Sequence, residues 1–84
     1  MRYSLNIHRV AQKKLSKFPV DVYRYIKESI LDLSVNPRPE GCLKLTGREA
    51  WLLRIRDYRI IYEIDDMDRT VTILDVDHRG NIYR

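Results

Sequence analysis

Residues 51–64 read Trp51-Leu-Leu-Arg-Ile-Arg-Asp-Tyr-Arg-Ile-Ile-Tyr-Glu-Ile64, and their pattern sets the architecture of the chain. Apolar and polar side chains alternate on both sides of Asp57, which is typical of two half-buried strands. Because the break between the two runs is so short, we predict an antiparallel hairpin. One face of this hairpin is expected to be aliphatic and aromatic. The other face carries Arg54, Arg56, Arg59 and Glu63.

The segments after the hairpin continue the sheet. The run Asp65-Asp-Met-Asp68 places three carboxylates in four residues, which predicts a solvent-exposed turn. Residues 69–76 are rich in β-branched side chains and predict a third long strand. Residues 77–81 break this pattern, and Ile82-Tyr83 offer a short last strand.

The first half of the chain predicts one strand and two helices. Apolar and polar side chains alternate from residue 2 to residue 7, as in a short strand. At His8, where we expect a capping or surface role, the period changes to that of an amphipathic helix. Pro19 interrupts this helix and can open a second one, which we predict to run to about Ser34. The apolar stripes comprise Ala11, Leu15 and Phe18 in the first helix and Val22, Ile26, Ile30 and Leu33 in the second.

Together these elements predict a single α+β domain over residues 1–84. An N-terminal strand and a helical hairpin precede an antiparallel three- to four-strand meander. A proline-rich loop at 36–41 and a short extended segment at 42–47 connect the two parts. The economical packing places both helices on one face of a twisted sheet. The opposite face is expected to stay half open and to carry the basic residues of the sheet.

Composition and charge narrow the class of protein. The 84 residues include 16 Lys and Arg against 12 Asp and Glu, so the formal net charge is +4. The single cysteine, Cys42, allows no intramolecular disulfide, and no Cys/His spacing indicates a zinc site. The amino-terminal residues lack the apolar region of a signal peptide, and no apolar run is long enough to span a membrane. We therefore expect a cytoplasmic protein without a metal or other cofactor.

The arginine-bearing face predicts an anionic ligand. Guanidinium groups bind phosphate oxygens bidentately and stay charged at every relevant pH. Arg54 and Arg59 flank one hairpin turn on adjacent strands, where cross-strand neighbours lie about 5 Å apart, near enough to hold one phosphate. Because Glu63 is the only carboxylate expected on this face, RNA is the first candidate. The alternative is that these arginines, and above all Arg56 beside Asp57, keep the surface soluble or pair with nearby carboxylates.

Other residues also fit RNA chemistry. Cleavage by the ribose 2′-hydroxyl needs in-line positioning, proton transfer and stabilisation of the phosphorane. His78 and Arg79 follow the third long strand in a predicted loop, and Tyr83 can transfer a proton or stack on a base. A lone histidine or an edge-strand tyrosine can equally be structural. A basic helix face, either solvated or in contact with ribosomal RNA, comprises Lys13, Lys14 and Lys17.

These motifs resemble those of the RelE/ParE toxin superfamily, on the RelE side, over essentially the whole chain. The resemblance covers the helical pair split at Lys17-Phe-Pro19, the loop Asn36-Pro-Arg-Pro39 and the segment Leu43-Lys-Leu-Thr-Gly47. It is most specific in residues 51–64 and in Val76-Asp-His-Arg-Gly-Asn-Ile-Tyr-Arg84. RelE-type members are small toxins of toxin–antitoxin pairs that resemble microbial ribonucleases and cut messenger RNA in the ribosomal A site. ParE-type members share the fold and poison DNA gyrase.

Carried over by position, the resemblance assigns roles to individual residues. It implies that Arg59 contacts the scissile phosphate and that Arg79 stabilises charge and acts as general acid. It implies that Tyr83 stacks on the nucleotide and orients it. Arg54 falls where a well-known member of the family has a lysine. A second lysine of that member, a proposed general base, is replaced here by Leu52, which can move no proton.

This departure leaves three functions open. The first is a ribosome-dependent mRNA endonuclease that works without metal, in which His78 or Arg54 takes the base role, or no residue does. The second is a gyrase poison without RNA chemistry. The third is an inactive relative whose basic face only binds its antitoxin. The candidate catalytic set of the first is Arg54, Arg59, His78, Arg79 and Tyr83, with RNA or ribosome contacts from Lys13, Lys14, Lys17 and Arg56.

All three functions imply a protein partner. The resemblance predicts a RelB-like antitoxin that forms a hetero-oligomer with the chain. Such an antitoxin would lay an amphipathic helix or an extended segment over apolar surface and carry acidic residues toward the arginines. The first function also predicts the ribosome and messenger RNA as partners.

Overall fold

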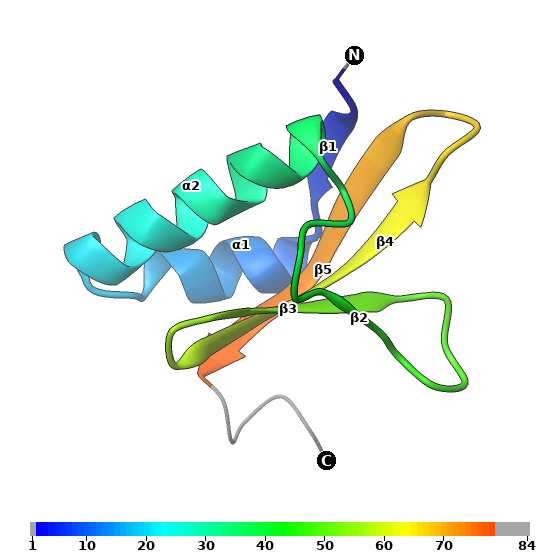
Figure 1. The fold of residues 1–84 in the computed structure, drawn as a ribbon. Helices are drawn as coiled ribbons and strands as arrows, with labels where there is room; N and C mark the ends of the chain where they lie inside the picture. The colour runs from blue at the N-terminus through cyan, green and yellow to red at the C-terminus, as the bar shows by residue number, and fades with distance from the viewer. Residues whose placement is uncertain (1, 79–84) are drawn as a thin grey trace.

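The computed structural model describes residues 2–78 and contains two helices and five strands in that range (Figure 1). The predicted α+β class is confirmed, with one strand and two helices before a run of strands. The predicted last strand at Ile82-Tyr83 and the site candidate Arg79 lie outside the described residues. The elements are β1 (Ser4–Ile7), α1 (Arg9–Ser16), α2 (Val20–Val35), β2 (Leu43–Lys44), β3 (Trp51–Ile55), β4 (Tyr58–Asp65) and β5 (Thr70–His78).

The five strands form one sheet in the order β1-β5-β4-β3-β2. Strands β2 to β5 are antiparallel neighbours, as the predicted meander requires. Strand β1 instead pairs in parallel with β5, with Leu5 opposite Val71 and Ile7 opposite Ile73. The first strand of the chain therefore lies at the edge of the sheet beside the last described one. The segment expected only to approach the sheet contributes β2, which forms the other edge.

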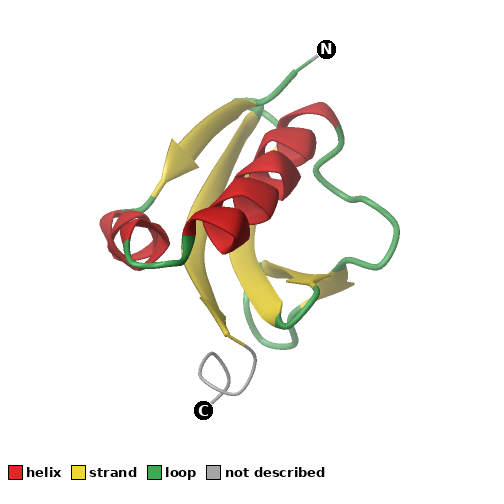
Figure 2. Cartoon of the chain, turned by 90° about the vertical axis from the view of Figure 1, so that its left-hand side faces the viewer, coloured by secondary structure: helices red, strands yellow, loops and turns green. Residues whose placement is uncertain are grey.

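Local signals explain where the helices begin. The Nδ1 atom of His8 accepts a hydrogen bond from the Val10 amide at 3.2 Å, so His8 caps α1 and the predicted capping role is confirmed. Pro19 stands at the N-cap of α2, and Asp21 lies in the first turn, where a negative charge suits the helix dipole. Both helices cover the same face of the sheet (Figure 2). Neither helix within residues 2–78 combines the length and apolarity needed to cross a membrane.

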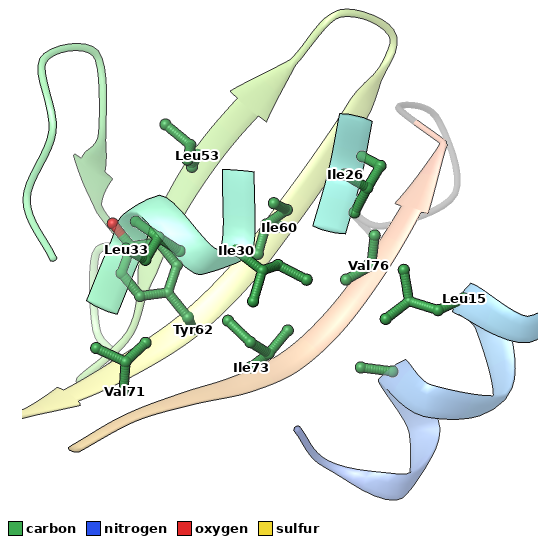
Figure 3. Packing of buried hydrophobic residues seen from close by; sticks show 11 residues of the cluster. Leu15, Ile26, Ile30, Leu33, Leu53, Ile60, Tyr62, Val71, Ile73 and Val76 are labelled. Carbon is green, nitrogen blue, oxygen red and sulfur yellow. The ribbon is translucent and has the colours of Figure 1, made fainter. Parts of the chain in front are cut away.

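The core lies between the helices and this covered face of the sheet (Figure 3). The predicted stripe of α2 is buried at Ile26, Ile30 and Leu33. Tyr62 on β4 is fully buried, and its hydroxyl donates a hydrogen bond to the Pro37 carbonyl at 2.8 Å. This bond ties the loop after α2 to the middle of the sheet. The buried cluster comprises Ala11, Leu15, Ile26, Ile30, Leu33, Leu53, Ile60, Tyr62, Val71, Ile73 and Val76.

Strand β5 contains one extra residue. Ile61 of β4 pairs with Asp75, whereas the next residue, Tyr62, pairs with Ile73. Leu74 therefore has no partner in the β4–β5 register, which defines a β-bulge. Because side chains alternate along a strand, one extra residue reverses the face that every following side chain takes.

The bulge changes which residues of β5 reach the core. Ile73 before it and Val76 after it are both fully buried under the helices, although they are three residues apart. Uninterrupted alternation from Ile73 would have placed Asp75 and Asp77 in the core. With the bulge, these two carboxylates take the opposite side of the strand and stay half-buried.

The face opposite the helices is less open than predicted. Ala50, Leu52 and Ile61 form a second buried cluster there, with Leu45 and Leu74 packed against it. The Leu45 amide donates to the Ala50 carbonyl at 2.9 Å, which extends the β2–β3 pairing by one step and places both residues at this cluster. The opposite face is therefore divided into this apolar cluster and a charged part near the β3–β4 turn.

An exposed network joins three segments that are distant in the sequence. Asp66, in the β4–β5 turn, accepts hydrogen bonds from the Tyr3 hydroxyl at 2.7 Å and from two Arg38 nitrogens at 3.2 and 2.9 Å. The guanidinium carbon of Arg38 also lies 5.2 Å from the centre of the Trp51 ring. Hydrogen bonds from Arg38, and then from Tyr3, hold the pKa of Asp66 below its usual value. The network fastens the strand β1 and the loop after α2 to the β4–β5 turn.

Candidate nucleic-acid interface

The β3–β4 hairpin places Arg54 directly opposite Arg59. Residues paired in this way point to the same face, with Cβ atoms about 4.5–5.5 Å apart. Arg54 is exposed, whereas Arg59 is half-buried and its Nε atom is inaccessible to solvent. Among residues 2–78, no carboxylate forms an ion pair with Arg54. Because like charges directly opposite each other are unfavourable, the pair favours an anion that both guanidinium groups can reach.

The neighbouring strand adds a carboxylate beside this pair. Asp77 of β5 is the register partner of Arg59 and lies on the same face. Glu63 was expected to be the only carboxylate on this face, and that prediction was wrong. The bulge at Leu74 is the reason, because it turns Asp75 and Asp77 away from the core. Both aspartates thus belong to this face although the sequence pattern did not predict them there.

Lys14 on α1 holds these two carboxylates. Its Nζ atom lies 2.9 Å from Asp75 Oδ1 and 2.9 Å from Asp77 Oδ2. The hydrogen bond to Asp75, joined by that to Asp77, raises the pKa of Lys14 although partial burial opposes the rise. Lys13 and Lys17 are exposed, but Lys14 is half-buried against β5. The expected basic helix face of three lysines is thus corrected to two, with Lys14 turned toward the sheet.

Arg56 does not share the face of the arginine pair. It lies in the two-residue turn between β3 and β4 and has a left-handed backbone with φ of 55°. Its guanidinium carbon lies 4.2 Å from the centre of the Tyr25 ring on α2, on the helix side of the sheet. The predicted grouping with Arg54 and Arg59 extended the strand alternation through the turn, where alternation does not apply. Arg56 packs as a cation on an aromatic ring instead.

His78 also lies away from the arginine pair. It is the last residue of β5 rather than part of a loop, and it pairs with Tyr58 in the register. The two rings meet edge to face with centroids 5.4 Å apart. Tyr58 packs under the helices against Phe18, with centroids 5.0 Å apart, and against Tyr25 at 6.4 Å. The imidazole is exposed, but it is on the helix side, whereas Arg59 faces the other way.

The remaining sequence-based candidates divide into two groups. Arg79 and Tyr83 lie outside the described residues, so their predicted roles stay predictions. Leu52, which stands where the resemblance expects a lysine, is 1% exposed inside the second apolar cluster. A lysine at this position would place its charged group in apolar surroundings.

Within residues 2–78, no three His, Cys, Asp or Glu side chains are grouped to hold a metal ion.

Comparisons with known proteins agree with this arrangement. A family model described as the ParE toxin of the type II toxin–antitoxin system parDE matches residues 5–83. The chain belongs to the RelE/ParE toxin superfamily. Toxin RelG of Mycobacterium tuberculosis is 38% identical to it over 88 residues, covering 100% of this chain and 99% of the relative. Putative toxin RelE1 of Methanocaldococcus jannaschii is 28% identical, covering 100% and 98%.

Solved structures of the superfamily share the fold of this RelE-like toxin. A chain of the toxin–antitoxin complex RelBE2 from Mycobacterium tuberculosis matches with a TM-score of 0.84 and 32% identity, over 94% of this chain and 100% of that chain. A chain of the archaeal RelE–RelB complex from Pyrococcus horikoshii matches with a TM-score of 0.85 and 31% identity, over 96% and 99%. The predicted RelE-like α+β architecture is therefore confirmed.

Proposed function

We propose that this RelE-like chain is a ribosome-dependent mRNA endonuclease that inhibits translation. The observation that carries the proposal is the direct opposition of Arg54 and Arg59 on a face that the helices leave uncovered. Two adjacent guanidinium groups match the oxygens of one phosphate. Membership of a toxin superfamily supports messenger RNA as the source of that phosphate.

The proposed chemistry is attack of the ribose 2′-hydroxyl on the neighbouring phosphate. The new bond joins the 2′ oxygen to phosphorus, and the bond to the 5′ oxygen breaks and leaves a cyclic phosphate. Arg54 and Arg59 hold the phosphate and balance the additional negative charge of the phosphorane. The resemblance adds Arg79 as a donor to the leaving oxygen and Tyr83 as a stacking partner of the base. These roles need no metal ion.

The proposed cleavage also needs a group that accepts the 2′ proton. Leu52 cannot accept it, and His78 would have to reach around the end of β5 to the arginine face. We keep His78 as the histidine to test, because it lies at the end of the strand nearest the arginines. Full cleavage by a His78→Ala variant would remove it from the site.

We also propose that the chain pairs with an antitoxin. The matched chains come from the toxin–antitoxin complex RelBE2 of Mycobacterium tuberculosis and from the RelE–RelB complex of Pyrococcus horikoshii. The two arginines favour a partner that brings acidic side chains to this face. Co-expression with the product of a neighbouring small gene, followed by co-purification, tests this. A chain that elutes alone from such a preparation would contradict the proposal.

Primer extension in a coupled translation assay tests the cleavage itself. We expect new mRNA ends within codons that occupy the ribosomal A site. These ends should fade in Arg54→Ala and Arg59→Ala variants but persist in Arg24→Ala, which removes the same charge from the exposed surface of α2. Matched circular dichroism spectra would show that all three variants fold.

A second candidate is a gyrase poison. The matching family model describes ParE toxins, and Leu52 lacks the chemistry of the expected lysine. Intact messenger RNA together with accumulating cleaved DNA–gyrase complexes would favour this candidate. Intact messenger RNA, normal gyrase and retained antitoxin binding would indicate an inactive relative.

A further inference from the structure

We propose that Lys14 is a positioning residue of the arginine face, and the inference rests on the proposed function. By holding the carboxylates of Asp75 and Asp77, Lys14 offsets part of the negative charge beside Arg59 that would oppose the approach of a phosphate. The residue thus acts on RNA through Arg59 without touching RNA itself.

The first support is a row of charges across the sheet. Arg54 on β3, Arg59 on β4 and Asp77 on β5 are consecutive register partners on one face. Lys14 on α1 continues the row beyond β5, with its Nζ atom 2.9 Å from Asp77 Oδ2. Asp77 therefore lies between the strand position of Arg59 and the Lys14 ammonium group, so its charge acts on both cations.

The second support is the way in which the carboxylate of Asp77 is held. The His78 backbone amide donates to Oδ1 at 2.8 Å, while Lys14 donates to Oδ2 at 2.9 Å. Asp75 is held in the same manner, since its Oδ1 accepts from the Val76 amide at 2.9 Å and from Lys14. The two strand amides fix the orientation of the carboxylates, and Lys14 supplies the charge that balances them.

The third support is the balance of charge at this edge of the sheet. Lys14 with Asp75 and Asp77 carries a net charge of −1, and without Lys14 the two carboxylates would carry −2. A phosphate that approaches Arg59 would then meet twice the negative charge at one side. The Lys14 side chain is 34% exposed and that of Asp77 is 20% exposed, so solvent screens these charges less than it screens fully exposed ones.

A purely structural role for Lys14 makes a different prediction. In that case the lysine only fastens α1 to β5, and its removal lowers stability without changing the RNA affinity of the folded protein. The positioning role and the purely structural role predict different RNA affinities when the Asp77 carboxylate is neutralised together with Lys14. Asp77→Asn removes the charge that Lys14 balances but cannot restore the contact between α1 and β5.

The test uses the full chain and a short single-stranded RNA with 2′-deoxy sugars, which cannot be cut by the 2′-hydroxyl. Affinity is measured at low ionic strength and below the melting temperature of every variant. We expect Lys14→Met to weaken binding on the order of tenfold, the size of an unbalanced charge near a protein surface. Lys27→Met, which removes the same charge from an exposed position on α2, should have a clearly smaller effect.

The deciding variant is the double substitution Lys14→Met with Asp77→Asn. It should recover most of the affinity that Lys14→Met loses while remaining less stable than the wild type. Asp77→Asn alone should bind more tightly than the wild type. If Lys14→Met fails to fold, Lys14→Gln, which keeps a hydrogen-bond donor but not the charge, takes its place in the single and double variants. An unchanged RNA affinity in Lys14→Met, or no recovery of affinity in the double variant, would overturn the inference but not the proposed function. A wild-type chain that does not bind the RNA would overturn the proposed function and the inference with it.

Discussion

Arg54 and Arg59 oppose each other across the β3–β4 hairpin, so two positive side chains share one site on the sheet. Like charges in this position destabilise the folded chain, whereas most cross-strand pairs stabilise it. A bound phosphate removes the repulsion. The repulsion between the two guanidinium groups should therefore be smaller in the anion-bound protein than in the free protein.

Replacing the exposed Arg54 with alanine should weaken RNA binding without lowering the melting temperature. The plot of log affinity against log salt concentration should become shallower by about 0.7 for each phosphate that the variant no longer neutralises, as expected for single strands. Titration of a short single-stranded RNA at several salt concentrations measures this slope. The Arg24→Ala variant should keep the wild-type slope, and an equal change there would mean that only net charge matters.

Leu52→Lys should destabilise the protein rather than supply a missing base. Leu52 is 1% exposed among Ala50 and Ile61, and a charged amine in apolar surroundings is unfavourable. The milder Leu52→Ala should lower the free energy of unfolding by about 2–5 kcal/mol, as for other buried leucines. Denaturant titration provides the measurement.

The neighbouring strand offers a matched control for this prediction. Leu43 is the register partner of Leu52 and is 47% exposed. Leu43→Lys should therefore fold with nearly wild-type stability. If Leu52→Lys were as stable as Leu43→Lys and cleaved RNA faster, the second apolar cluster would not be the reason for the leucine.

Tyr62→Phe should lower the free energy of unfolding by about 1 kcal/mol, because it leaves the Pro37 carbonyl without its donor at 2.8 Å. Tyr23 on α2 is 39% exposed, so Tyr23→Phe should be close to neutral.

Burial also raises the pKa of Tyr62 above its usual value. Because the folded pKa is the higher one, the associated stability is present below the pKa of the unfolded chain and is lost as the pH rises. The Tyr62→Phe variant should lose this part of the alkaline destabilisation.

Asp66→Asn should lower the melting temperature at neutral pH and reduce the loss of stability in acid. Its carboxylate accepts hydrogen bonds from Arg38 and Tyr3, and these hold its pKa below the usual value of 3.8. A lowered pKa gives stability that is present above the unfolded value and is lost as the pH falls through the folded one. Melting curves across the acid range measure this. Asp68→Asn, an exposed position in the same turn, should leave the acid profile unchanged.

Most of the fold could be predicted from the sequence because its signals are local. The alternation in residues 51–64 predicted the β3–β4 hairpin, and Pro19 marked the boundary between the helices. The pairing of β1 with β5 could not be predicted in this way. It joins residues more than sixty positions apart, such as Ser4 and Thr70, and no short pattern specifies it.

The site was predictable in part for a similar reason. The opposition of Arg54 and Arg59 follows from a short turn and a period of two. Arg56 was misplaced because a turn residue was treated as a strand residue. The contact of Lys14 with Asp75 and Asp77 depends on how α1 packs against β5. The apolar pattern of the helix does not predict that contact. The bulge itself could have been recognised in the sequence, because the apolar residues Ile73 and Val76 are three positions apart and not two.

The unpaired Leu74 also determines how this chain must be aligned with other members of its superfamily. A relative without the extra residue requires a gap of one position in β5, next to Leu74. Without that gap, Asp75 and Asp77 would be matched to core positions of the relative. Sequence differences at the positions of the two carboxylates would then be mistaken for substitutions in the core. Equivalent residues in this strand are therefore best assigned from the backbone pairing of β4 and β5.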